Sequence, residues 1–223
     1  SVFPSARSVI LMDDESPQSK ALQWIVDLRH SNPEEHFTNT SIVQMYSLLT
    51  LFYSTNGETS WSRMDGWLNS TNECGWFGVV CQNIQEGSTR PVHAIIDLAL
   101  SGNGLNGTFP PDVAILSDTL SMLDFSANNV LGPLPSEVGL LTELTSLDIS
   151  RNILTEVIPS TIGDLTNLIH LDVSDNSFSG ILPPEIGNLT NVIWMSIARN
   201  NLFGSIPSQF GLLRHLEHFE CGW

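Results

Sequence analysis

The second half of the chain carries a pattern of apolar and polar positions that repeats itself. Within residues 168–189, Leu168, Leu171 and Val173 are spaced so that their side chains can face one interior, and Phe178 and Leu182 follow. A stretch of this length cannot bury its own apolar face. It therefore has to pack beside near copies of itself.

The copies are found by self-comparison. Five asparagines recur at intervals of 25, 24, 24 and 24 residues, namely Asn103, Asn128, Asn152, Asn176 and Asn200. Two apolar columns run in register with them: Leu98, Leu123, Leu147, Leu171, Met195 and Phe219, then Leu100, Phe125, Ile149, Val173, Ile197 and Cys221. A fixed period of this size predicts a solenoid, with five full repeats and an incomplete sixth over residues 92–223.

The repeats resemble the plant-type leucine-rich-repeat family, whose unit reads LxxLxxLxLxxNxLxGxIPxxLGxL. The resemblance is carried by a glycine column and by an Ile-Pro column. The glycines are Gly107, Gly132, Gly180 and Gly204, and the Ile-Pro column contains Phe109-Pro110, Leu134-Pro135, Ile158-Pro159, Leu182-Pro183 and Ile206-Pro207. It implies an α/β solenoid, a right-handed leucine-rich-repeat horseshoe with a parallel concave sheet and an N-terminal helical cap. Glu156 replaces the glycine in the third repeat, which leaves the local turn there open.

The first part of the chain is predicted to be helical. Residues 1–16 show no sustained period and are interpreted as a tail or linker. From Pro17 the pattern becomes helical, because Ala21, Trp24, Ile25 and Leu28 share one face, and Asn32-Pro33 ends this helix. A second helix is expected from about Thr40 to Asn56-Gly57. Residues 17–91 are therefore predicted to form a helical cap over the first repeat, ending in a polar loop over residues 82–91.

Cys74 and Cys81 lie in a tryptophan-rich segment that resembles the N-terminal cap of plant-type repeats. The match lies at Trp67, Cys74, Trp76, Gly78, Val79 and Cys81, and it implies a Cys74–Cys81 disulfide. A redox role is the alternative, although the spacing is not CxxC. The long helical segment ahead of this cap also looks like that of secreted or membrane-anchored repeat proteins of diatoms. Cys221 occupies an inward position, which predicts a buried thiol, with a disulfide to another segment or chain as the alternative.

Charge and modification signals limit the possible partners. The formal net charge is −16, and the repeats from residue 92 hold fourteen Asp and Glu against three Arg. Nucleic acid and anionic membranes are therefore poor partners. Four Asn-x-Ser/Thr sequons, at Asn39, Asn69, Asn106 and Asn188, favour the secretory route together with the disulfide. No catalytic motif occurs, so we predict neither an enzyme nor a bound cofactor or metal.

Candidate binding residues follow from the predicted strands, in which side chains alternate between core and surface. The outward positions place His170, Trp194 and His218 in one column, and Asp148 and Asp172 in another. Arg151 and Arg199 flank them in a further column. The aspartates are typical of a hydrogen-bonded ladder, yet their mutual repulsion could also be relieved by Ca²⁺ or by a basic ligand group. Trp194 either anchors a ligand or covers its neighbours.

We therefore predict an extracellular, receptor-like recognition module that binds a protein, peptide or glycan on its concave face. One alternative is a structural or adhesive cell-surface or matrix protein that self-associates through the end of its solenoid. Another, implied by the resemblance alone, is a secreted inhibitor of wall-degrading enzymes.

Overall fold

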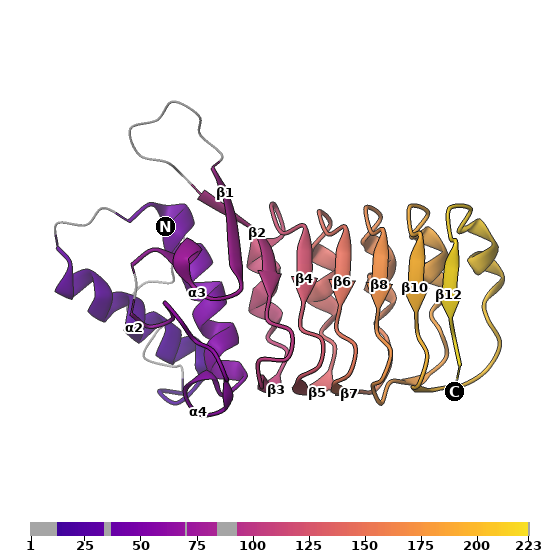
Figure 1. Ribbon diagram of the computed structural model, residues 1–223, viewed down its shortest axis with the longest axis horizontal. Helices are drawn as coiled ribbons and strands as arrows, with labels where there is room; N and C mark the ends of the chain where they lie inside the picture. The colour runs from indigo at the N-terminus through magenta and orange to yellow at the C-terminus, as the bar shows by residue number, and fades with distance from the viewer. Residues whose placement is uncertain (1–12, 34–36, 70, 84–92, 223) are drawn as a thin grey trace.

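The structure is a computed structural model that describes residues 13–33, 37–69, 71–83 and 93–222. Most of the predicted tail over residues 1–16, most of the loop over residues 82–91, Ser70 of one sequon, and Trp223 lie outside these residues. The chain forms a helical N-terminal unit followed by a row of stacked coils, each of which contributes one strand to a common sheet (Figure 1). Among the described residues, no helix is long and apolar enough to span a bilayer.

The helices of the N-terminal unit start at side-chain caps. Helix α2 (Pro17–Ser31) begins after Ser16, whose Oγ accepts the Ser19 N–H at 3.2 Å. Helix α3 (Asn39–Ser54) begins after Thr38 in the same way. Asn56 adopts the left-handed conformation, with φ of 53°, and so ends α3 as predicted. A short helix that the sequence pattern did not indicate, α4 (Gly57–Ser60), follows at once.

Aromatic rings form the core between these helices and the first repeat. Trp67 is fully buried, and its ring lies 4.8 Å from that of Trp61, 4.9 Å from that of Trp76 and 5.6 Å from that of Phe52, measured between centroids. The predicted disulfide between Cys74 and Cys81 is present and closes the turn from η1 (Glu73–Gly75) into β1 (Val79–Asn83). Strand β1 then pairs antiparallel with β2 (His93–Ala99), which joins this unit to the solenoid.

The main sheet has seven strands in the order β1-β2-β4-β6-β8-β10-β12, and every pair after the first is parallel. Its short strands are β4 (Met122–Asp124), β6 (Ser146–Asp148), β8 (His170–Asp172), β10 (Trp194–Ser196) and β12 (His218–Glu220). Each strand pairs with the next so that the predicted columns lie side by side. The middle residue of each of these strands from β4 to β10 is buried, which confirms the predicted inward column.

The other faces of the coils carry shorter elements. A three-stranded sheet contains β3 (Asn106–Thr108), β5 (Asn129–Pro133) and β7 (Ile153–Thr155), and a two-stranded sheet contains β9 (Ser179–Gly180) and β11 (Asn201–Leu202). Short 3₁₀ helices lie across the core from the main sheet: η2 (Pro111–Leu116), η3 (Ser136–Leu140), η4 (Ser160–Asp164), η5 (Pro184–Asn188) and η6 (Ser208–Leu212). The fold is the predicted leucine-rich-repeat solenoid with an N-terminal cap.

Glu156 keeps the backbone turn that glycine makes in neighbouring repeats. Its φ is 65°, against 81° for Gly132 and 82° for Gly180. The pairing between β7 and β9 is reduced at this point to a single bridge, between Val157 and Ser179. The turn therefore forms even though the residue there has a side chain, and its backbone conformation is strained for such a residue.

We expect Glu156→Gly to raise the free energy of unfolding by up to about 1 kcal/mol, because glycine adopts positive φ without steric cost. Chemical denaturation, monitored by circular dichroism, measures this change in the free energy of unfolding. Glu185→Gly is the matched control, because Glu185 lies in η5 and is not among the residues with positive φ. There the same substitution should lower stability, and two changes of the same sign would contradict the strain argument.

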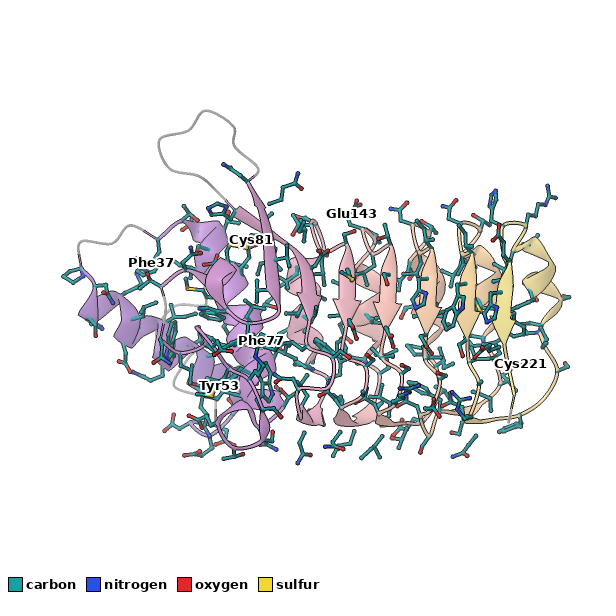
Figure 2. All side chains as sticks on the ribbon, viewed as in Figure 1. Phe37, Tyr53, Phe77, Cys81, Glu143 and Cys221 are labelled. Atoms are coloured by element: carbon teal, nitrogen blue, oxygen red, sulfur yellow. A yellow bond between two sulfur atoms is a disulfide. The ribbon has the colours of Figure 1, made fainter. Side chains whose placement is uncertain are left out.

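The prediction of a buried Cys221 thiol is wrong. Cys221 is a free and exposed cysteine, at the end of the sheet where Figure 2 labels it. An inward position is buried only when coils lie on both of its sides. Among the described residues, no coil follows β12.

Candidate functional site

Three aromatic rings stand in a row on the exposed face of the main sheet. The strand register pairs His170 with Trp194 and Trp194 with His218. The ring centroids of His170 and Trp194 are 4.4 Å apart at an interplanar angle of 12°, and those of Trp194 and His218 are 5.5 Å apart at 9°. We call these residues the ring ladder. Its rings stack because adjacent parallel strands are separated by about 4.8 Å, which is close to ring-stacking distance.

The central ring of the ladder is held in place from both sides. Trp194 is half-buried between the two imidazoles, so its edge rather than its faces is presented to solvent. No described residue accepts a hydrogen bond from its indole N–H. On one side, His218 Nε2 lies 3.1 Å from Glu220 Oε1. The ring ladder is therefore a rigid aromatic surface with a hydrogen-bond donor available to a ligand.

A carboxylate column runs next to the ring ladder. One oxygen each of Asp148 and Asp172 accepts a backbone N–H, from Ser150 and Ser174 respectively, at 2.9 Å. Each bond joins residues two apart in the same coil, so the column is a series of local hydrogen bonds repeated from coil to coil. Burial raises the pKa of Asp172 above its usual value, and the neighbouring charge of Asp148 adds to this shift.

We expect Asp172→Asn to raise stability at pH 7 by less than about 1 kcal/mol in buffer containing a chelator. A carboxyl whose folded-state pKa is raised costs stability once pH rises above its unfolded value, and the amide removes that cost while keeping the Ser174 hydrogen bond. The gain should disappear near pH 3.

Asp175→Asn is the matched control. The Arg199 guanidinium lowers the pKa of the Asp175 carboxyl, so its contribution is present at pH 7 and is lost as pH falls. Asp175→Asn should therefore reduce stability at pH 7. Denaturation curves at both pH values test the pair, and equal shifts in the two variants would contradict the assignment.

Arg151 and Arg199 project from left-handed turns just after the strands. Their φ values are 53° and 51°, and Asp175 in the coil between them has 51°. Arg199 donates two hydrogen bonds to Asp175, with Nη2 at 2.6 Å from Oδ2, and Arg151 Nε lies 3.9 Å from Oδ2. Both guanidinium groups are thus partly neutralised by Asp175, a residue that the sequence analysis did not place in the site.

A shallow hollow of about 380 Å³ brings most of the predicted residues together. Five of them line it, namely Asp148, Arg151, Asp172, Trp194 and Arg199. His170 and His218 stand on either side of Trp194. The structure therefore gathers all seven predicted residues into one patch.

A second hollow, of about 770 Å³, was not anticipated from the sequence. It follows the edge of the sheet where the strands begin, near the Glu143 labelled in Figure 2, and Ile169, Ile193 and His215 also line it. The signal was present in the spacing. Three steps separate the inward Leu168 and Leu171, so the two residues between them both face outward, and simple alternation accounts for only one.

The four sequon asparagines are exposed, and none belongs to the seven-stranded sheet. Asn39 opens α3, Asn69 lies in the cap, Asn106 is on β3 and Asn188 ends η5. Glycans at these positions, which we continue to predict, would leave the ring ladder accessible.

Comparisons with known proteins support the leucine-rich-repeat fold. The sequence model described as "Leucine rich repeat" matches residues 142–202. A probably inactive leucine-rich repeat receptor-like protein kinase of Arabidopsis thaliana is 38% identical over 73 residues, which are 33% of this chain and 11% of that protein. A putative leucine-rich repeat receptor-like serine/threonine-protein kinase of the same plant is 35% identical over 88 residues, which are 36% of this chain and 8% of that protein. The chain thus matches about a tenth of the length of these relatives.

Solved structures are similar over most of the chain. The leucine-rich-repeat ectodomain of the receptor kinase SOBIR1 from Arabidopsis thaliana has a TM-score of 0.69 and 27% identity, covering 83% of this chain and 93% of that one. A chain of the BIR3–SERK2 complex from the same plant has a TM-score of 0.64 and 31% identity, covering 77% of this chain and 91% of that one.

Proposed function

Because this chain belongs to the plant-type leucine-rich-repeat proteins, we propose that it is an extracellular, receptor-like recognition domain that binds a peptide or protein on its concave sheet. In this proposal the chain has no catalytic activity of its own. The seven predicted residues form the binding surface, with Trp194 as its anchor.

The ring ladder is the observation that carries the proposal. Stacking on His170 and His218 orders the Trp194 side chain before any ligand arrives, so a ligand that contacts its exposed edge costs little of the side-chain entropy of Trp194. Tryptophan is enriched among residues that dominate binding energy. The carboxylates beside it favour a ligand with basic groups.

The compartment and the class of partner are supported by two further observations. The Cys74–Cys81 disulfide and the four exposed sequon asparagines suit an oxidising secretory route. The BIR3–SERK2 structure is a complex between two proteins, and the SOBIR1 structure is an ectodomain. A peptide or protein ligand is thus favoured over a glycan.

A phage-displayed random-peptide library, selected on the immobilised chain, tests the proposal. We expect the selected peptides to bind the His170→Ala/Trp194→Ala double variant at least tenfold more weakly than the unaltered chain, as for a binding anchor. Phe203→Ala is the control, because Phe203 is an exposed aromatic residue outside the main sheet. Peptides that bind all three proteins equally would overturn the concave-face proposal.

Self-association is the second candidate function. Three apolar side chains of the last coil are at least half exposed, namely Phe203, Ile206 and Leu212, and Cys221 is exposed near Ile206. Sedimentation velocity over a range of concentrations, with and without reductant, distinguishes association through this apolar surface from a Cys221 disulfide. A monomer at all concentrations would exclude both.

A further inference from the structure

His170 lies beside two carboxylates as well as in the ring ladder. Asp148 and Asp172 are register partners on β6 and β8, and His170 precedes Asp172 by two residues on the same face of β8. One potential ligand atom of each residue lies within 4.8 Å of the other two. We propose that Asp148, His170 and Asp172 bind a divalent transition-metal ion, of which Zn²⁺ is the best fit.

The donor set identifies the class of ion. One imidazole nitrogen and two carboxylate oxygens suit Zn²⁺ and its first-row neighbours, whereas Ca²⁺ and Mg²⁺ take oxygen donors. The backbone N–H groups of Ser150 and Ser174 bond to Oδ1 of Asp148 and Asp172, and a carboxylate has lone pairs enough to bind a metal as well. Three protein donors leave one tetrahedral position open toward solvent.

The imidazole is suitably placed and is not otherwise engaged. Neither ring nitrogen of His170 has a hydrogen-bond partner among the described residues, whereas His215 contacts the Thr190 carbonyl oxygen and His218 contacts Glu220. Stacking on Trp194 uses the face of the His170 ring, and a metal binds in the ring plane, so both contacts can exist together. Trp194 also orients the ring, which reduces the entropy lost on binding.

The same column provides an internal comparison. Asp124 and Asp148 are also register partners, but the residue before Asp148 on that face is Ser146 rather than histidine. A nonspecific acidic patch would treat the two carboxylate pairs alike. A metal site would use only the pair that His170 completes.

Calorimetric titration of the full chain with Zn²⁺ at neutral pH tests the proposal without any peptide ligand, so it does not depend on the proposed function. We expect one site, whose affinity falls by more than about tenfold in His170→Gln, Asp148→Asn and Asp172→Asn, since even loss of a residue that only supports a metal ligand costs 10–100-fold. Asp124→Asn and His215→Gln should bind as the unaltered chain does, because His215 lies outside the ring ladder and contacts the Thr190 carbonyl oxygen.

Co²⁺ gives a second measurement. The unaltered chain should develop visible absorption of a tetrahedral Co²⁺–nitrogen site that excess Zn²⁺ removes, and Ca²⁺ should not compete. If the His170→Gln chain, folded by circular dichroism, binds Zn²⁺ unchanged, or if Asp124→Asn weakens binding as much as Asp148→Asn, the proposal is wrong. If His170→Gln does not fold, the unaltered chain still tests the proposal, because the absence of a tetrahedral Co²⁺ spectrum there is enough to show that the proposal is wrong.

Discussion

Replacing Trp67 with alanine is expected to lower the free energy of unfolding by about 3–5 kcal/mol, the range for large aromatic side chains removed from a core. Trp67 is fully buried, and its ring contacts those of Phe52, Trp61 and Trp76. Its indole N–H donates to the Phe77 carbonyl oxygen at 3.0 Å, so the substitution also leaves that oxygen without its partner.

The effect should be greatest in the cap and the first repeat, because a solenoid repeat contacts only its neighbours. Chemical denaturation measures the total, and amide hydrogen exchange shows where protection is lost. Trp194→Ala is the matched control, since it removes the same side chain from a half-exposed position. It should cost clearly less than Trp67→Ala, because Trp194 is already half exposed and its two stacked ring pairs contribute only about 0.5–1.5 kcal/mol each. Equal losses in the two variants would contradict a cap held by its aromatic core.

The fold could be predicted because every parallel strand of the solenoid has an apolar residue at the same position of the repeat. A single strand with a buried Leu147 is ambiguous, but columns that place Leu123, Leu147 and Leu171 in one register leave one solution. The helices at Pro17 and near Thr40 were also visible, since both start signals are local. The short helix α4 was not, because Gly57 follows a helix-ending Asn56 and its helical turn depends on tertiary packing.

The site was only partly predictable. Adjacent columns place His170 and Trp194 on neighbouring strands, but the stacking of their rings depends on side-chain rotamers, which spacing does not determine. The pairing of Arg199 with Asp175 was missed for a similar reason. Both residues leave left-handed turns, whose geometry turns the side chains toward each other across coils.

Asn128→Ala is expected to lower the free energy of unfolding by about 2–4 kcal/mol, because it leaves several buried backbone groups without partners at once. Asn128 Oδ1 accepts the Leu105 N–H at 3.0 Å, and its Nδ2 lies 2.8 Å from the Leu100 oxygen and 3.0 Å from the Phe125 oxygen. The bonds to Leu105 and Leu100 join the second coil to the first, and the bond to Phe125 fixes the turn within the second coil.

Asn191→Ala is the matched control for this prediction. Asn191 also bonds to the preceding coil, with Nδ2 at 2.8 Å from the Thr166 oxygen, but the contact is exposed and water can replace it. We expect a loss of about 0.5 kcal/mol, comparable to an ordinary surface substitution. Denaturation curves of the two variants compare their losses in free energy of unfolding and so show whether the buried asparagine column stabilises the fold. If Asn128→Ala costs no more than Asn191→Ala, the buried ladder does not hold the coils together, and apolar packing alone must do so.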